Sequence, residues 1–346
     1  MKQQTGWLSK NEVRAAIRRT GNAPRRIPLV RTKWWGDGLV AQYGAALDSF
    51  ADYPEDAIQI FMAPLRYETM RLSWPLPDAG SYDNTPIIDE WSKLDEFIEK
   101  LPRAENDERW EPLAAQADTA RKQDRYLLFS WWHLFFERAW VLRGMENLMV
   151  DYYEEPEHVH RLHNALTDLY EDYISTAVRY LRPDGFFTSD DLGHQKGPMM
   201  SPGQFREHMV PYYHRIGTYC HSHDLDFWLH SCGDNTALLP DLIASGVDVF
   251  HPVQKHTMDE EQVAADFGGK ISFMAGIDVQ HVLQESDPEG VRREVRFLVD
   301  TFARPDGGLC LAAGNGIVAG TPLENIRAFL DEALHYQNAT RRTTAT

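Results

Sequence analysis

The sequence predicts an α/β protein, a (β/α)8 or TIM barrel with a helical extension at its N-terminus. From residue 126 onward, short apolar runs of strand character alternate with segments whose apolar residues recur at helical spacing, which is typical of parallel βα units. Six such runs follow residue 126 and two extended stretches precede it, and eight strands close a barrel. No Gly-rich phosphate turn follows the first strand, as it would in the rival doubly wound sheet.

The N-terminal third supplies the extension and the first two strands. Ser9 and Glu12 have the spacing of a capping box and open a short basic helix that runs to about residue 20. An extended stretch over 28–33 and a buried run over 58–62 are the first two predicted strands. A loop rich in Pro, Asp and Gly follows at 75–86, then helices at 87–101 and 110–123.

The remaining chain is regular. The six further strands are predicted at 126–131, 185–188, 226–230, 247–250, 270–275 and 308–313. Helices are predicted at 134–143, 145–153, 157–181, 201–224, 236–245, 259–267, 288–302 and 321–336, where Ser201 and Thr321 are each followed by Pro at the helix start.

Length and composition set limits on the partners. The 346 residues, 43% of them hydrophobic, suffice for one large barrel, so we assign 1–55 to the extension and 56–340 to a single barrel domain. The net charge of −17 argues against nucleic acid as a partner, because affinity for phosphates comes from clustered Lys and Arg.

The cysteine content and the hydropathy pattern indicate the compartment. Three Cys residues do not form a disulfide framework, and this count fits a reducing cytoplasm. The N-terminus lacks the apolar segment of a signal peptide, and no run of about 18 apolar residues predicts a membrane span. We therefore expect a cytoplasmic protein that does not bind a membrane.

Polar side chains follow five successive predicted strands. They are Asp190, Asp191, His230, Cys232, His251, Asp278 and Asn315. In a (β/α)8 barrel the carboxyl ends of the strands build the site. Each such residue taken alone is more often a helix cap or a loop side chain, but their convergence on one rim favours a functional mouth.

His230 and Cys232 are the most informative pair. Side chains at i and i+2 in a strand point to one face, so an imidazole nitrogen and a thiolate can reach one ion. Zinc prefers such ligands, and a catalytic zinc needs three from the protein. The alternative is a buried His beside a small core Cys. Core packing is also the expected role of Cys220, which is helical, and of Cys310, about 16 Å from the rim.

Four segments resemble the uroporphyrinogen decarboxylase superfamily. They are HSCG at 230–233, FMAGID at 273–278, GNGI at 314–317 and TPLEN at 321–325. The similarity extends from about residue 28 to 336 and implies a (β/α)8 barrel. The superfamily includes methyltransferases that work with corrinoid proteins, in which a His-x-Cys pair and a distant Cys bind a zinc that activates a thiol.

Two departures from that pattern matter. Residues 31–36 lack the Arg-rich signature of true uroporphyrinogen decarboxylases, so the resemblance does not imply porphyrinogen decarboxylation. Asn315 stands where the methyltransferases have their third ligand, and an amide oxygen is a poor zinc ligand. Either Glu137 or another carboxylate completes the site with His230 and Cys232, or the metal is weakly bound, different or absent.

The resemblance implies a methyltransferase or demethylase. We expect Zn²⁺ on His230, Cys232 and Glu137, a small thiol or methylated substrate, and a methylcorrinoid on a partner protein, since no Asp-x-His-x-x-Gly cobalamin segment is present. The expected catalytic side chains are Asp190, Asp191, His194, His251 and Asp278, and the expected cofactor-binding side chains are Trp34, Trp35 and Asn315.

Two alternatives stay open. A metal-independent decarboxylase or lyase would use Asp190, Asp191 and His251 to orient a small acid and protonate a carbanion. A binding protein would retain the barrel and bind a small ligand or a corrinoid protein without turnover.

Overall fold

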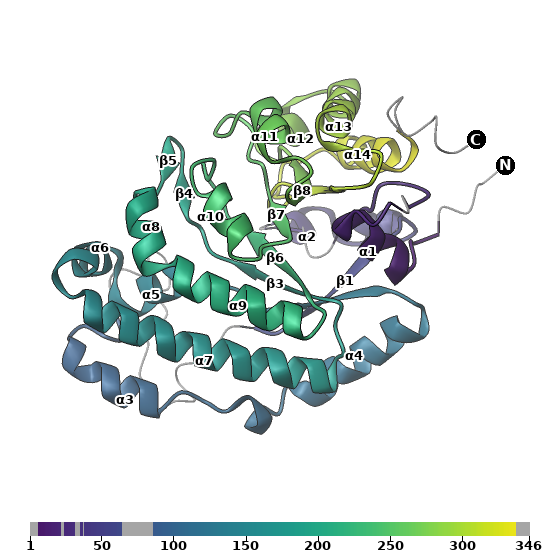
Figure 1. Cartoon of the computed structure of the whole chain (residues 1–346). Helices are drawn as coiled ribbons and strands as arrows, with labels where there is room; N and C mark the ends of the chain where they lie inside the picture. Colours follow the sequence, from purple (N-terminus) through teal and green to yellow (C-terminus); the bar gives the residue numbers. More distant parts are fainter. Residues whose placement is uncertain (1–5, 22–23, 32–34, 37, 64–85, 337–346) are drawn as a thin grey trace.

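A curled sheet of seven parallel strands forms the centre of the molecule, with helices around its outside (Figure 1). The computed structural model describes residues 6–21, 24–31, 35–36, 38–63 and 86–336. In spatial order the strands are β1 (Ala57–Phe61), β2 (Tyr126–Ser130), β3 (Gly185–Ser189), β6 (Asp226–His230), β7 (Val249–His251), β8 (Ser272–Ile277) and β9 (Leu309–Ala313).

Residues 28–30 take the place of the eighth strand. The backbone N–H of Val30 donates to Leu311 O (2.9 Å), and Leu311 N–H donates to Pro28 O (2.9 Å) on β9. On the other side, Asp56 N–H donates to Leu29 O (2.9 Å) just before β1. This stretch closes the barrel and confirms the predicted fold class. Of the expected strand at 28–33, residues 32 and 33 lie outside the described part.

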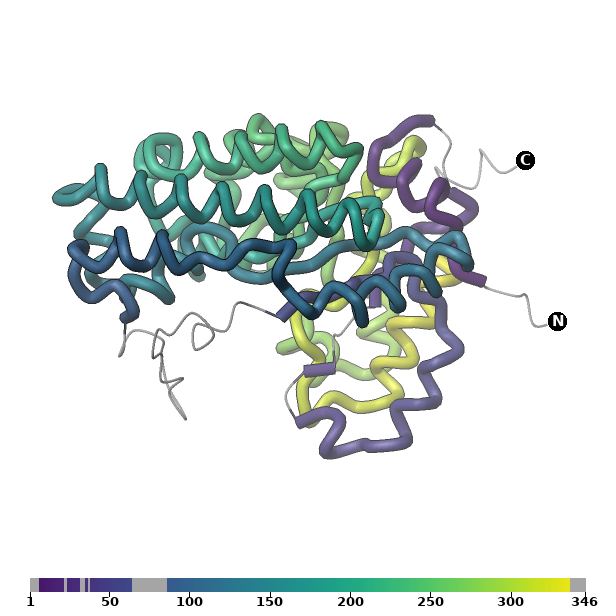
Figure 2. Tube along the Cα trace, turned by 90° about the horizontal axis from the view of Figure 1, so that it is seen from below, coloured from purple at the N-terminus to yellow at the C-terminus, as the bar shows by residue number. Residues whose placement is uncertain are grey.

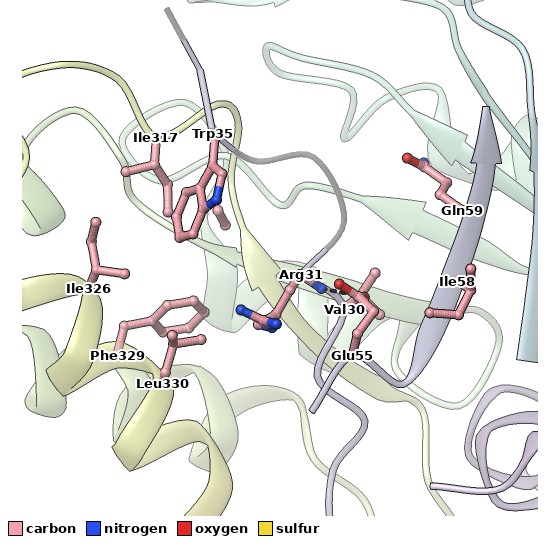
Figure 3. Close-up of a pocket in the computed structure, with 11 residues that line it drawn as sticks. Val30, Arg31, Trp35, Glu55, Ile58, Gln59, Ile317, Ile326, Phe329 and Leu330 are labelled. Carbon is pink, nitrogen blue, oxygen red and sulfur yellow. Dashed lines mark hydrogen bonds between the residues drawn. The ribbon is translucent and has the colours of Figure 1, made fainter. Parts of the chain in front are cut away.

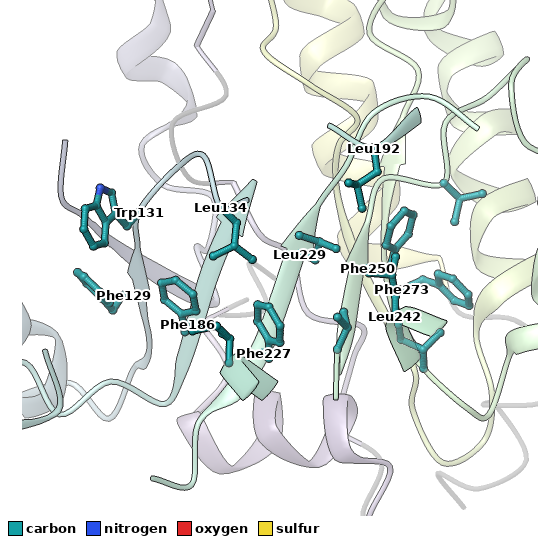
Figure 4. Packing of buried hydrophobic residues seen from close by; sticks show 14 of the residues in the cluster. Phe129, Trp131, Leu134, Phe186, Leu192, Phe227, Leu229, Leu242, Phe250 and Phe273 are labelled. Atoms are coloured by element: carbon teal, nitrogen blue, oxygen red, sulfur yellow. The ribbon is translucent and has the colours of Figure 1, made fainter. Parts of the chain in front are cut away.

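Alternating side chains of the strands build two apolar layers. The barrel interior includes Tyr126, Leu128, Phe187, Trp228, Met274 and Cys310. The layer between strands and helices includes Leu127, Phe129, Phe186, Phe227, Phe250 and Phe273, several of which lie along one face of the sheet in Figure 4. Because both faces are covered, the strands are apolar at nearly every position, as parallel strands are.

The N-terminal helix closes one end of the barrel. α1 (Lys10–Arg18) begins with the predicted capping box of Ser9 and Glu12. Leu8, Val13 and Ile17 belong to the interior cluster, so they cover the end from which the strands start. The opposite end, where the strands terminate, is therefore the one left for a site.

Each predicted helix has a counterpart in the expected order, but the described residues contain further short helices that were not predicted. In the first half they are α2 (Leu39–Tyr43), η1 (Gly44–Phe50), η4 (Trp91–Lys93), α3 (Leu94–Glu99), η5 (Ala104–Asn106), α4 (Trp110–Lys122), α5 (Phe136–Arg143), α6 (Met145–Glu154) and α7 (Pro156–Tyr180). In the second half they are α8 (Pro202–His208), α9 (Val210–Ser222), α10 (Leu239–Ala244), α11 (Glu260–Phe267), α12 (Val282–Glu285), α13 (Pro288–Phe302) and α14 (Leu323–His335). The unpredicted helices include α2, η1 and α12. Among the described residues, no helix has the length and apolarity to cross a membrane.

Three local differences have physical reasons. The predicted helix at 201–224 divides at Met209, because Pro211 lacks the N–H that a continuous helix would need there. The predicted helix at 87–101 is shortened to α3 after a 3₁₀ turn, and of the predicted loop at 75–86 all but residue 86 lies outside the described residues. A small hairpin of β4 (Gly193–His194) and β5 (Gly197–Pro198) was not predicted, since two-residue strands have no apolar period.

The N-terminal segment before β1 packs on the C-terminal helix. Tyr53 Oη donates to Asp331 Oδ1 (2.6 Å), and an Arg327 guanidinium nitrogen donates to Ser49 Oγ (3.2 Å). Figure 2 shows this purple segment beside the yellow α14. The segment before β1 and the C-terminal helix α14 are therefore in direct contact.

Candidate metal centre

Three potential metal ligands converge at the carboxyl ends of β3 and β6. His230 Nε2 lies 3.4 Å from Cys232 Sγ and 3.7 Å from Asp191 Oδ1. One ligand atom from each of the three side chains lies within 4.8 Å of the other two. A nitrogen, a sulfur and an oxygen donor at this separation form a set that fits zinc.

Strand pairing brings these residues together. Ser189 is in register with His230 across β3 and β6, and Asp190 N–H continues the ladder by donating to His230 O (2.9 Å). The next residue, Asp191, accepts the backbone N–H of Cys232 at Oδ1 (2.8 Å). The carboxylate is thus held against the His-x-Cys segment by a backbone contact.

The loop that carries Cys232 is held from several sides. The Asn235 side-chain amide donates to the carbonyls of residues 231–233, at 3.1, 3.0 and 3.2 Å. Gly233 N–H donates to Gln254 Oε1 (2.7 Å). Gly233 has a φ of +82°, and a Cβ there would lie 2.2 Å from the Gly193 carbonyl carbon, so only glycine fits. Neither Asn235 nor Gln254 was expected from the sequence.

The electrostatics of this group favour a cation. Burial, and then the charges of Asp191 and Glu137, raise the pKa of the Cys232 thiol to about 12. The Asn315 amide donates to Cys232 Sγ (3.6 Å) and acts in the opposite direction. A thiol beside two carboxylates is a poor thiolate alone, and a bound metal ion supplies the positive charge that would ionise it.

Glu137 lies beside the three-donor group, in the first turn of α5. Its Oε2 accepts the hydroxyl of Ser189 (2.5 Å), and its Oε1 lies 3.8 Å from His133 Nε2. Burial, and then the charges of Asp191 and Asp190, raise the pKa of Glu137 to about 8. The carboxylate that joins His230 and Cys232 in the compact group is that of Asp191.

Asp190 faces away from that group. It is fully buried, and its carboxylate accepts backbone N–H groups of residues 135–137, at 3.2, 3.1 and 2.8 Å, and the Tyr213 hydroxyl (2.7 Å). Burial raises its pKa to about 6, against these hydrogen bonds. Asp190 therefore fixes the start of α5, and with it Glu137.

His251 is also buried, at the end of β7. Its Nδ1 lies 2.7 Å from His230 Nδ1, and its Nε2 lies 3.0 Å from the carbonyl oxygen of Ala313. Burial, and then the neighbouring His230, lower the pKa of His251 well below its usual value. Its contacts reach the metal-ligand group through His230.

A cavity of about 260 Å³ opens beside Cys232. His194, Asp278 and Asn315 line it together with Cys232, so the structure brings four of the expected residues to one cavity. Asp278 also accepts the backbone N–H of Gln280 (2.8 Å), which is a capping contact. Trp132, unforeseen although it follows directly on a predicted strand, has its ring 5.9 Å from the His230 ring and forms an aromatic wall.

A second cavity, of about 320 Å³, lies elsewhere, between residues 30, 31 and 35, β1 and α14 (Figure 3). Trp35 lines it with Arg31 and Phe329, so Trp35 is not at the cavity beside Cys232. Trp34 lies outside the described residues. The smaller cavity is the better candidate for chemistry, because Cys232 lines that one.

Comparison with known proteins agrees with this architecture. A methylated-thiol--coenzyme M methyltransferase from Methanosarcina mazei is 27% identical over 195 residues, which are 56% of this chain and 49% of the relative. The chain thus matches about half the length of that relative. A solved methyltransferase from Methanosarcina mazei shares the fold, with a TM-score of 0.62 and 16% identity over 94% of this chain and 98% of that one.

The family is established by a longer match. The family model described as uroporphyrinogen decarboxylase (URO-D) matches residues 98–336, from α3 to just beyond α14, and includes all three potential metal ligands. The chain belongs to the uroporphyrinogen decarboxylase (URO-D) family.

Proposed function

We propose that this chain is a zinc-dependent methyltransferase that moves a methyl group between a small sulfur compound and a corrinoid on a separate protein. The observation that carries the proposal is the convergence of Asp191, His230 and Cys232 at the mouth of the barrel. The name of the Methanosarcina mazei relative, which contains a methylated thiol and a methyltransferase activity, supports the reaction class.

Asp191, His230 and Cys232 would hold the ion, and a small substrate would enter through the cavity beside Cys232. When bound, Zn²⁺ supplies a Lewis acid that stabilises a substrate thiol as its thiolate. Three protein ligands are the number typical of catalytic zinc sites, which leave a position for substrate.

Glu137 is the residue that we assign to proton transfer. Methylation of a thiol forms a C–S bond, breaks the C–Co bond with its electron pair left on cobalt, and releases the thiol proton. Without metal, burial and the charges of Asp191 and Asp190 raise the pKa of Glu137 to about 8, so the carboxyl is mostly protonated at neutral pH. The positive charge of a bound Zn²⁺ would lower this pKa, and the ionised carboxylate could then take the thiol proton and, in the reverse direction, return it to the sulfur. Ser189, which donates to Glu137 Oε2, holds the carboxyl in place.

The surrounding side chains restrict water. Trp132 covers one side of His230, and His251 and Asp190 are fully buried behind the ligands. A dry surrounding strengthens the electrostatic interactions of the ligand group. The cavity of about 260 Å³ suits a substrate of a few heavy atoms, so we assign the corrinoid to a partner that docks over the mouth.

Metal content tests the ligand set. Plasma mass spectrometry of protein purified without added metal should find about one zinc per chain in the wild type and in Cys310→Ala, a control cysteine in the barrel interior. We expect His230→Ala, Cys232→Ser and Asp191→Asn to lose it. Glu137→Gln should retain it, and loss there instead of in Asp191→Asn would assign the third ligand to Glu137.

Activity is tested with methylcobalamin as the corrinoid and a series of thiols that includes coenzyme M, which the name of the relative contains. The proposal predicts methyl transfer by the wild type and none by Cys232→Ser. A wild type that binds no zinc, even when zinc is supplied, would contradict it and direct attention to a metal-independent decarboxylase or lyase.

A further inference from the structure

We propose that His251 is a positioning residue that fixes the tautomer of His230, so that His230 turns an unprotonated Nε2 toward Cys232 and Asp191. The inference concerns two rings of this chain. It rests on the proposed function only where it names zinc as the ion that Nε2 would bind.

A backbone carbonyl determines which nitrogen of His251 carries the proton. His251 Nε2 lies 3.0 Å from the oxygen of Ala313, the last residue of β9. A carbonyl oxygen only accepts hydrogen bonds, so the proton of this contact must belong to His251 Nε2. Gly276 of β8 allows the carboxyl end of β9 to approach closely, since a Cβ at Gly276 would lie 2.3 Å from Gly314 Cα.

The second ring nitrogen of His251 then determines the state of His230. A neutral imidazole carries one proton, so Nδ1 of His251 is left as an acceptor. It lies 2.7 Å from His230 Nδ1, which must therefore donate. The register of β6 and β7, which pairs His230 with His251, sets this contact.

The alternative is a doubly protonated His251, which is disfavoured because burial, and then the neighbouring His230, lower the pKa of His251 well below its usual value. A proton on both nitrogens of His251 would create a buried imidazolium, and His251 is completely buried with the Phe187 ring on one side. The nearest carboxylate among the contacts of the two rings, Asp191, faces the far nitrogen of His230 at 3.7 Å. The neutral His251 with Nε2–H satisfies the contacts of its two nitrogens with Ala313 O and His230 Nδ1.

The consequence concerns the other nitrogen of His230. In a neutral His230 with Nδ1 protonated, Nε2 carries the lone pair, and it lies 3.4 Å from Cys232 Sγ. Metal-ligating histidines commonly donate their second N–H to a fixed acceptor, which sets both ring orientation and tautomer. Here the acceptor is another histidine, and the series Ala313–His251–His230 links three strands of the barrel to the metal-ligand group.

The direct test reads the protons themselves. The metal-free wild-type protein, labelled with ¹⁵N at its 14 histidines, is examined by long-range ¹H–¹⁵N correlation at slightly alkaline pH. Signals are assigned by their loss in His230→Asn and His251→Asn. We expect the Nδ1–H form for His230 and the Nε2–H form for His251. The Nε2–H form of His230 would overturn the proposal.

Variants test the consequence for metal affinity. His251→Leu removes the acceptor, and we expect zinc affinity, measured by chelator competition, to fall roughly 10- to 100-fold. His251→Asn keeps an acceptor oxygen near Nδ1 and should restore most of that loss. His163→Leu, which removes another fully buried imidazole, in α7, is the matched control and should leave zinc affinity unchanged.

The outcomes separate this inference from the proposed function. The tautomers are measured without metal, so the expected signals support the inference even in a protein that transfers no methyl group. Equal zinc affinity of His251→Leu and wild type would overturn it even in an active methyltransferase. If His251→Leu does not fold, the tautomers of the wild type decide.

Discussion

Single residues at the mouth of the barrel differ in role even when they are adjacent. Asp190 is fully buried and accepts four hydrogen bonds from α5 and Tyr213, whereas the Asp191 side chain is 38% exposed and lies against His230. The sequence places both at the end of a strand. Which of them turns toward His230 depends on the pairing of β3 with β6 and on the position of α5, and neither can be read from the residues themselves.

Two of the three potential metal ligands could be predicted from the sequence. The period of a strand predicts that His230 and Cys232 share a face, and the structure brings their side chains together. The third donor could not be chosen from the sequence, because Glu137 and Asp191 both follow strands and both come near Cys232. Trp34 stays a prediction, because it lies outside the described residues.

Glu137 gives a prediction about stability. In the metal-free protein its pKa is raised to about 8, so the native state holds a proton that the unfolded chain releases near its ordinary value. Stability from this group is therefore present at low pH and lost as pH rises toward 8. The free energy of unfolding of wild type minus that of Glu137→Gln should fall by about 1 kcal/mol per pH unit between pH 5 and 8.

Denaturant unfolding at a series of pH values, with a chelator present, measures this difference. Asp107→Asn is the control, because burial raises the pKa of Asp107 but its hydrogen bonds from Arg109 outweigh this and lower it, so this substitution should show no such slope above pH 6. If the free energies of unfolding of the wild type and Glu137→Gln changed in parallel with pH, this would contradict the raised pKa of Glu137.

At the scale of elements, short connections position the site more than the strands do. The strands and most helices follow from apolar period and from caps such as Ser201 and Asp287, whose side chains accept from the first turn of α8 and α13. The hairpin β4–β5 and the loop after β6 follow no period, and they hold each other through Asp234 N–H, which donates to His194 O (2.9 Å). The arrangement of the hairpin and the loop depends on tertiary contacts, so it could not be predicted from the sequence.

Gly233 and Gly269 form a matched pair for testing this loop. Both have a left-handed φ, of +82° and +90°, but only Gly233 has a neighbour in the way of a Cβ. Gly269→Ala should cost about 1–2 kcal/mol of stability and leave zinc content intact. Gly233→Ala should cost more, because the hairpin must shift, and should weaken zinc binding. Thermal unfolding and metal analysis decide, and equal effects of the two substitutions would contradict the account.

For the whole molecule, one end of the barrel is structural and the other carries the candidate metal site. α1 closes the end where the strands begin, and the metal-ligand group lies at the other. The alternation of strands and helices, with the extended stretch predicted at 28–33, suffices to predict a barrel, but the pairing of Leu29 with Leu311 of β9 could not be read from the sequence. The division of the chain into 1–55 and 56–340 stays a proposal, and the hydrogen bonds of residues 28–30 to β9 join the two parts.

Arg18 tests the separation of the two ends. Its guanidinium binds Asp224 and Asp226 (both 2.6 Å), and the Asp226 side chain is almost completely buried. Arg18→Ala leaves that carboxylate without its cation, so we expect a loss of about 1–3 kcal/mol of stability. Zinc content should not change, because the substitution lies at the far end of the barrel.

Chemical denaturation and metal analysis of the same samples measure both effects. Arg25→Ala removes an exposed ion pair with Glu12 and should change stability by less than about 0.5 kcal/mol. Loss of zinc in Arg18→Ala at a temperature where the protein is folded would contradict the independence of the two ends.

The central claim is that Asp191, His230 and Cys232 form one zinc site. X-ray absorption at the zinc edge of the purified protein tests it most directly, because it counts sulfur ligands. We expect one sulfur at about 2.3 Å with nitrogen and oxygen ligands for the remainder, and no sulfur in Cys232→Ser supplied with zinc. Two or more sulfur ligands, or the same spectrum from Cys232→Ser as from the wild type, would contradict the claim.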